Sequence, residues 1–245
     1  MKVAVVGKGG AGKTTTAAVV ARTLARSGRR VIALDGDTNP NLGLSLGVGF
    51  DETERLVGMR QALDAEGDSQ DHASGWDDLI DRFGSAGPDG VRFAVVSQID
   101  NPDPGCPCCG LSPEQLLGNV VSDDATIVAD LEAGIGTLTR LDEATIEAAL
   151  VVVEATPKSI EVGQRAVEVA RIKGVRAVIV VANRIRSAED RAIIGAAFPE
   201  CEIMEVPDDP AIVTADRDGV APLDQAEASP AVVALVAVAD RIATV

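Results

Sequence analysis

The sequence predicts an α/β fold, in which helices flank a doubly wound, mostly parallel sheet. Short β-rich runs alternate with helical patterns along most of the chain. A glycine-rich loop follows the first of these runs and opens a helix. Hydrophobic residues make up 46% of the 245 residues and aromatic residues only 2%, so the core must be built from Val, Ala, Leu and Ile. Such a core suits a parallel sheet that is covered on both faces.

The expected strands are apolar runs that end at glycine or polar residues. In chain order they are Val3–Val6, Val31–Leu34, Arg92–Val96, Thr126–Ala129, Leu150–Val153, Ala177–Val181 and Glu202–Val206. Helical patterns fill most of the gaps, including one that starts near Lys13 and those at Ser159–Lys173 and Ala188–Ala197. In sheets of this kind ligands bind at the carboxyl ends of the strands, so we expect the functional residues there.

Two segments depart from the alternation of strands and helices. Gly49–Gly90 is rich in Asp, Glu, Gly and Ser and holds the only histidine, His72, and the only tryptophan, Trp76. We interpret it as a partly helical excursion of the same domain. Pro230–Val245 is apolar with a helical pattern and lacks a basic face, so it is predicted to pack on the domain as a helix. We therefore expect a single domain over residues 1–245.

The charge of the chain argues against several classes of partner. Its formal net charge is −16, which disfavours binding to nucleic-acid phosphates and to anionic membrane surfaces. We see no signal peptide before the first strand and no apolar run long enough to span a bilayer. The expected location is the cytoplasm.

A complete phosphate-binding loop connects the first expected strand to the first helix. It is predicted to comprise Gly7, Lys8, Gly9, Gly10, Ala11, Gly12, Lys13, Thr14 and Thr15. Glycines let backbone N–H groups point at phosphates, Lys13 reaches the β and γ phosphates, and the Thr14 hydroxyl is a ligand for Mg²⁺. The loop predicts binding of ATP and ADP with Mg²⁺.

Carboxylates follow two of the expected strands. Asp35 and Asp37 leave the second strand, and their side chains are expected to point towards the phosphates, with Asp35 near the Mg²⁺ shell. Asp130 follows the strand that ends at Ala129, a position that suits an aspartate holding Mg²⁺ through water. Gly134 offers a hinge beyond it. The alternative is that these aspartates only cap turns.

Three of the four cysteines, Cys106, Cys108 and Cys109, lie in one loop. A Cys-x-Cys pair cannot complete a four-ligand metal site alone, but Cys106 and Cys108 of two chains related by a two-fold axis supply four sulfurs. Thiolates suit zinc, Cu(I) and Fe–S clusters, and also nickel in planar geometry. Reduced, unliganded thiols and a single-chain site that includes Cys109 stay open as alternatives. Cys201 begins an apolar strand and is predicted to be a buried small hydrophobe.

The loop from Lys8 to Thr14 matches Lys-Gly-Gly-x-Gly-Lys-Thr and resembles that of the deviant P-loop ATPases, which include the MinD, ParA, ArsA and nitrogenase iron-protein families. The resemblance implies that Lys8 reaches the partner's phosphates across a nucleotide-sandwich homodimer, and that Asp37 positions the attacking water. It also implies an adenine-binding set after two late strands, made up of Asn183, Val206, Pro207 and Asp209.

The chain also resembles the CooC family, accessory ATPases for nickel insertion into carbon monoxide dehydrogenase. The shared motifs are the phosphate loop, Asp35–Leu42, the Cys-x-Cys, Asp130–Ile135, Thr156–Ser159 and Val206–Pro210. The resemblance implies ATP hydrolysis, dimerisation on binding nucleotide or metal, and a client metalloenzyme as partner. Two features depart from the family: Gly136-Thr137 stand where an acidic-His pair is common, and Cys109 is additional.

Two other functions stay open. A positioning ATPase of the MinD and ParA class needs a basic amphipathic tail or a basic patch for DNA, and neither is visible in the sequence. An ATPase that bridges an Fe–S cluster takes one cysteine just after the second switch, but Asp130–Arg140 contains none.

Overall fold

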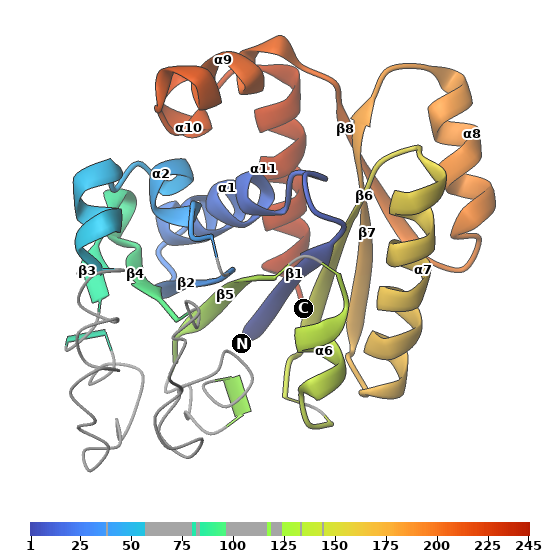
Figure 1. Cartoon of the computed structure of the whole chain (residues 1–245), viewed down its shortest axis with the longest axis horizontal. Helices are drawn as coiled ribbons and strands as arrows, with labels where there is room; N and C mark the ends of the chain where they lie inside the picture. Colours follow the sequence, from blue (N-terminus) through green and yellow to red (C-terminus); the bar gives the residue numbers. More distant parts are fainter. Residues whose placement is uncertain are drawn as a thin grey trace.

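The computed structural model describes residues 1–37, 39–56, 80–81, 84–96, 117–118, 124–132, 134–143 and 145–245. Its sheet has eight strands in the order β3-β4-β2-β5-β1-β6-β7-β8 (Figure 1). The strands are β1 (Lys2–Gly7), β2 (Val31–Gly36), β3 (Gly84–Ala86), β4 (Arg92–Val95), β5 (Thr126–Leu131), β6 (Ala148–Val153), β7 (Ala177–Ile185) and β8 (Glu202–Pro207). All neighbouring pairs are parallel except β3 with β4, so the predicted fold class is confirmed.

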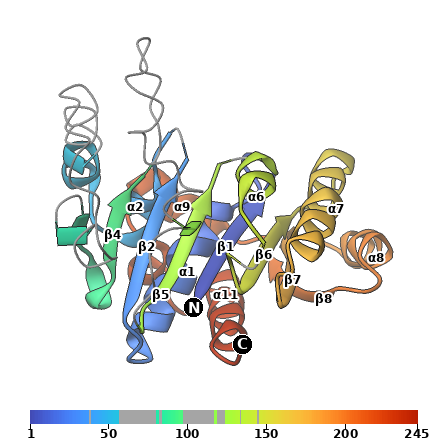
Figure 2. The same ribbon diagram turned by 90° about the horizontal axis from the view of Figure 1, so that it is seen from below.

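The helices are α1 (Lys13–Arg26), α2 (Leu42–Leu46), α6 (Gly136–Arg140), α7 (Pro157–Ile172), α8 (Ala188–Ala197), α9 (Pro210–Asp218), α10 (Pro222–Gln225) and α11 (Pro230–Ile242), with a 3-10 turn, η1 (Pro88–Gly90). They cover both faces of the sheet (Figure 2). Helices α1, α2 and α11 pack on one face, and α6, α7 and α8 pack on the other. Each face buries its own aliphatic cluster, because alternate side chains along a strand point to opposite faces.

Every strand expected from the sequence is present. The short antiparallel strand β3, which was not predicted, lies in the Gly49–Gly90 excursion, where residues 50–56 are also helical. His72 and Trp76 lie outside the described residues. As predicted, the C-terminal helix α11 packs on α1 and β8, and it buries Val232, Leu235 and Val238. Within the described ranges, no helix combines the length and apolar character needed to cross a bilayer.

Charged side chains mark the terminal strand β8. Glu202 accepts two hydrogen bonds from Arg241 of α11, at 2.8 and 2.9 Å, and Glu205 accepts one from Arg191 of α8 at 2.5 Å. The two arginines come from opposite faces of the sheet. Glu202 and Glu205 are three residues apart, and successive side chains of a strand point to opposite faces. Helices on both faces therefore hold this strand in place.

Candidate functional site

The phosphate loop joins β1 to α1 at the carboxyl edge of the sheet. Gly7 has φ +148° and Gly12 has φ +98°, and a Cβ atom on Gly7 would lie 2.3 Å from Val152 O. Glycine is therefore required where the loop leaves the strand. Lys13 is only 6% exposed at the start of α1. The loop thus has the strand-loop-helix context in which backbone N–H groups and a helix N-terminus bind phosphate.

Lys8 is partly exposed and belongs to the same loop. Its Nζ donates a hydrogen bond to Gly9 O at 3.1 Å, so in the single chain the ammonium folds back on its own loop. Gly9 and Gly10 are exposed beside it. The role of Lys8 across a dimer stays a prediction.

Thr14 and Asp130 lie together beside the loop. The Thr14 hydroxyl donates to Asp130 Oδ2 at 2.6 Å, while Asp130 Oδ1 is buried without a hydrogen-bond partner in the described part of the chain. A buried carboxylate oxygen without a partner is costly, so a missing ligand is expected there. Burial raises the pKa of Asp130 to about 6, against the opposing effects of the Thr14 hydroxyl and Lys13.

Asp35 is the register partner of Asp130 on the neighbouring strand, and it is completely buried. Burial, followed by the charge of Asp130, raises the pKa of Asp35 well above its ordinary value. Two buried carboxylates side by side repel each other, and a cation between them removes that cost. This pair and the Thr14 hydroxyl fit Mg²⁺, which is usually held by one or two carboxylates together with phosphates and water.

Asp35 also organises the segment that follows β2. Its Oδ1 accepts from Asp37 N at 3.1 Å and its Oδ2 accepts from Leu42 N at 2.8 Å, at the start of α2. Asp37 Oδ1 accepts from Asn39 N at 3.0 Å. The capping alternative therefore describes what both aspartates do in this structure. Water positioning by Asp37 and a place for Asp35 near Mg²⁺ stay predictions.

A contact that sequence reasoning missed joins the segment after β5 to the phosphate loop. Gly134 N donates to Gly7 O at 3.0 Å, and the two residues form an isolated antiparallel bridge. Gly134 has φ +99°, a conformation that favours glycine. The expected hinge therefore starts in direct contact with the loop that would hold the phosphates.

The residues assigned to adenine lie at the ends of β7 and β8. Asn183 Nδ2 donates to Ala11 O at 2.7 Å, which places this amide against the phosphate loop. Val206 is buried and Pro207 is partly exposed at the end of β8. Asp209 caps α9 through Ala211 N at 2.9 Å and also accepts from Ala231 N of α11 at 3.1 Å. Adenine binding by this set stays a prediction.

The predicted soft-metal ligands Cys106 and Cys108, together with Cys109, lie outside the described residues. In the part of the chain that is described, no group of three or more His, Cys, Asp or Glu side chains is placed to hold a metal ion by itself. Cys201 differs from its prediction, because it is only partly buried. It precedes the terminal strand rather than lying inside the sheet, which leaves one side of it open.

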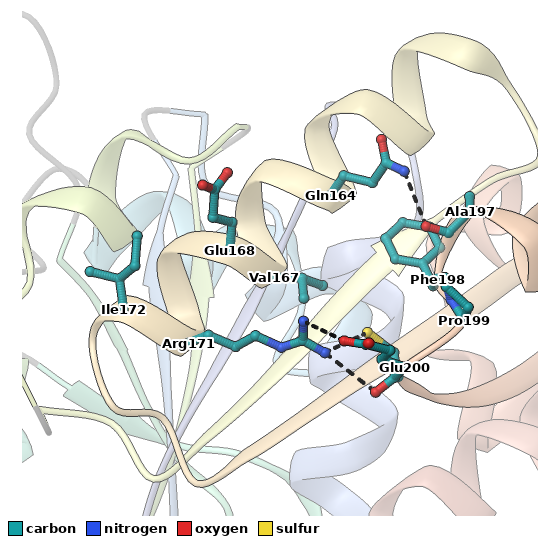
Figure 3. A pocket seen from close by; sticks show the side chains of 10 residues that line it. Gln164, Val167, Glu168, Arg171, Ile172, Ala197, Phe198, Pro199 and Glu200 are labelled. Atoms are coloured by element: carbon teal, nitrogen blue, oxygen red, sulfur yellow. Dashed lines mark hydrogen bonds and ion pairs between the residues drawn. The ribbon is translucent and has the colours of Figure 1, made fainter.

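Cys201 lines a cavity of about 350 Å³ between α7 and residues 197–201 (Figure 3). Arg171 Nη2 lies 3.6 Å from Cys201 Sγ, and Glu168 and Glu200 complete the charged part of the lining. The cavity lies at the C-terminal end of α7, whereas the helix begins at the phosphate-loop edge of the sheet. It is therefore separate from the site built around Lys13 and Asp130.

Comparisons with known proteins agree with this geometry. The family model described as "CobQ/CobB/MinD/ParA nucleotide binding domain" matches residues 2–223. An uncharacterized ATP-binding protein of Methanocaldococcus jannaschii is 30% identical over 207 residues, which cover 79% of this chain and 78% of that protein. The carbon monoxide dehydrogenase accessory protein CooC of Rhodospirillum rubrum is 27% identical over 241 residues, which cover 91% and 90% of the two chains.

Solved structures add evidence on the fold alone. The cell division ATPase MinD of Pyrococcus furiosus superposes with a TM-score of 0.71 at 24% identity, covering 99% of this chain and 98% of that one. The family model spans the phosphate loop, both aspartate segments and the β7 and β8 ends described above. This chain belongs to the family of CobQ/CobB/MinD/ParA nucleotide-binding domains.

Proposed function

We propose that this chain is a Mg²⁺-dependent ATPase that forms a dimer around its nucleotides and serves the insertion of a metal, nickel or zinc, into a client metalloenzyme. The observation that carries the ATPase part is the Thr14–Asp130 pair. It leaves one buried carboxylate oxygen without a partner among the described residues, beside a complete phosphate loop. ATP fits the loop because Lys13 and the backbone N–H groups supply the positive charge that its phosphates need.

Thr14 and Asp130 would hold the Mg²⁺, with Asp35 near its shell. When bound, the ion would neutralise charge that develops on the phosphates during phosphoryl transfer. The chain's own groups do the remaining work. Lys13 binds the phosphates from within the loop, and Asp37 orients the attacking water through its carboxylate.

Lys8 completes the site of a second copy. Among the described residues, its ammonium donates to Gly9 O of its own loop, a neutral acceptor in a partly exposed position. Exchanging this contact for a partner's phosphates replaces a hydrogen bond to a neutral carbonyl by one between two charged groups. Such a lysine acts as an arginine finger does, so hydrolysis is coupled to dimerisation.

The accessory role is supported by the length of the similarity to CooC and by the Cys-x-Cys in the sequence. The metal is cargo: Cys106 and Cys108 of two chains supply four sulfurs only in the dimer. Opening the dimer after hydrolysis halves that set and releases the ion to the client. Because the similarity to CooC covers 91% of the chain, we also propose that residues 1–245 form a single ATPase domain.

The ATPase is tested by phosphate release at saturating ATP, with Mg²⁺ and with excess EDTA, for the parent and for Lys13→Ala. We expect slow turnover that depends on Mg²⁺ in the parent, and a loss of nucleotide binding or hydrolysis in the variant. Unchanged turnover in Lys13→Ala would reject the phosphate-loop assignment.

A further inference from the structure

Strand β7 gains one extra residue just before it ends. From Ala182 to Ile185 it takes three steps, while its partner strand β8 takes two steps from Glu205 to Pro207. A one-residue excess of this kind is a β-bulge. The residue inside it, Arg184, has φ +55°, in the left-handed region that non-glycine residues rarely adopt.

The bulge decides which way the end of β7 faces. Ile179 and Val181 belong to the cluster beneath α1, whereas Ala182 belongs to the opposite cluster. Strict alternation would return residue 185 to the α1 face, yet Ile185 is buried in the opposite cluster. Asn183 therefore continues the set that faces the phosphate loop, and Arg184 absorbs the shift.

The Asn183 amide is fixed in direction by its contact with the loop. Its Nδ2 donates to Ala11 O at 2.7 Å, so its Oδ1 must point the other way as an acceptor. Among the described residues no donor reaches that Oδ1. An acceptor held in this orientation accepts from the 6-amino group of adenine and repels the 6-oxo group of guanine.

Arg184 is held in its unusual conformation by an anchor just beyond the end of the neighbouring strand β6. Its Nη1 donates to Glu154 Oε1 at 2.6 Å, and the Glu154 side chain is only 20% exposed. Glu154 is fixed in turn, because its N–H donates to the buried Ser159 Oγ at 2.9 Å and its carbonyl accepts from Thr156 N at 2.7 Å. A left-handed residue persists where its surroundings hold it, and among the described residues this ion pair is what holds the Arg184 side chain.

We propose that the Arg184–Glu154 ion pair holds the β7 bulge, and thereby the Asn183 amide, in the orientation that selects ATP over GTP. Arg184 is thus a positioning residue for nucleotide specificity, an inference that rests on the proposed binding of ATP. Without the ion pair, the bulge relaxes and the Asn183 amide can turn. Its Nδ2 can then donate a hydrogen bond to the 6-oxo group of guanine.

The test is competition of ATP and of GTP against a fluorescent ribose-labelled ATP, with the ratio of the two dissociation constants as the readout. Arg184→Met removes the charge, Arg184→Gly keeps the left-handed backbone but removes the side chain, and Glu154→Gln removes the other partner. Each variant should lower the preference for ATP about fivefold, as expected for one partly exposed ion pair. Arg184→Met combined with Glu154→Gln should lower it no further, because both changes remove the same interaction.

Arg186→Gln is the matched control. Arg186 lies two residues further on, is 67% exposed and pairs loosely with Asp190 at 3.8 Å, so its loss should leave the ratio unchanged. Arg184→Lys keeps a positive charge opposite Glu154 and should retain most of the preference for ATP. A merely structural role would weaken both nucleotides equally and leave the ratio at the parent value, which would overturn the inference.

The parent protein separates this inference from the proposed function. If the parent binds neither nucleotide, the proposed function fails. If it binds ATP and GTP equally well, or if Arg184→Gly keeps the parent's preference, nucleotide binding stands and the role of Arg184 is rejected.

Discussion

The Thr14 hydroxyl donates a hydrogen bond of 2.6 Å to Asp130 Oδ2 across 116 positions of the sequence. The start of helix α1 and the end of strand β5, which are distant in the chain, thus meet at the point where a phosphate-bound cation would sit. Because Asp130 Oδ1 stays buried without a partner in the described chain, the pair is half satisfied. A buried carboxylate oxygen without a partner has an unfavourable free energy, and the binding of a ligand to it removes that penalty.

Asp130→Asn should weaken the dependence of nucleotide binding on Mg²⁺. An amide keeps the shape of the side chain but removes the charge that a divalent cation needs. We expect ATP affinity in Mg²⁺ to fall about tenfold or more, towards the value measured in EDTA, as for the loss of one charged contact. Titration of both proteins with ATP, with and without Mg²⁺, measures this, and equal Mg²⁺ dependence would exclude Asp130 from the site.

Lys8→Ala should still bind ATP, because Lys13 and the backbone donors of the loop remain. It should lose ATP-driven dimerisation and nearly all hydrolysis, since the ammonium that enters the partner's site is gone. Size-exclusion chromatography with light scattering reports the first property, and phosphate release reports the second. Lys173→Ala, at the far end of α7, is the control that should behave as the parent. A dimeric, active Lys8→Ala would show that the lysine acts only in its own loop.

Asp37→Asn should trap the ATP-bound dimer. The amide nearly preserves the turn that Asn39 N makes onto Oδ1, but it orients a water molecule poorly. Hydrolysis should fall by about two orders of magnitude, the range for loss of a general base, while dimerisation persists. Hydrolysis within a few-fold of the parent would assign water positioning to another residue.

Cys106→Ser or Cys108→Ser should abolish metal-driven dimerisation, whereas Cys109→Ser should leave it largely intact. The parent should bind one Ni²⁺ or Zn²⁺ per two chains, because four sulfurs require two copies of the pair. Metal and ATP should each tighten binding of the other by a common factor, since both favour the dimer. Equilibrium dialysis gives the stoichiometry, and one metal per monomer at full occupancy would favour the single-chain site instead.

Asp224→Asn should lower the free energy of unfolding at neutral pH by about 2 kcal/mol. This is the cost of two lost hydrogen bonds between charged groups, reduced because Asp224 is partly exposed. Arg22 is 2% exposed, and its guanidinium donates to both oxygens of Asp224 at 2.7 Å and to Asp89 at 2.6 Å. The hydrogen bond from Arg22 lowers the pKa of Asp224. Asp224 therefore stabilises the fold above its unfolded pKa of about 4, and that contribution is lost as the pH falls below it.

Urea unfolding of the parent and of Asp224→Asn at pH 7 and near pH 3 checks this. The difference between the two proteins should shrink towards zero at the acid end. Glu161→Gln, which removes an exposed pair with Arg165, should change the unfolding free energy by less than about 0.5 kcal/mol at either pH. A difference that stays constant with pH would show that Asp224 acts through packing and not through its charge.

The main elements of the fold could be predicted because local patterns and tertiary structure agree. Aliphatic runs without aromatic residues gave the central parallel strands, and the phosphate loop gave the edge of the sheet at which the site lies. The antiparallel β3 was not predictable, since Gly84–Ala86 has no apolar alternation of its own and pairs only because β4 is already in place. The partly buried Cys201 was misjudged because the sequence does not show which strand ends the sheet.

The contacts inside the site were less predictable than its members. Asp35 could be placed at a strand end, but its capping of Leu42 N depends on how the segment between them turns. The bulge at Arg184 carries no turn signal, because arginine is an unusual residue for a left-handed conformation. Sequence reasoning thus found the residue types and their edge of the sheet, whereas the hydrogen bonds between them required the packed structure.

The paired charges on β8 have a consequence for how copies of this chain can associate. An open strand at the rim of a sheet invites a second molecule to add its own strand there, and natural proteins guard such rims with charge. Here Glu202 and Glu205 are held by Arg241 and Arg191, so charged side chains flank this edge on both faces of the sheet. End-to-end stacking of sheets into open fibres is thereby disfavoured. The dimer proposed above instead meets at the carboxyl edge of the sheet, in a contact that closes after two copies.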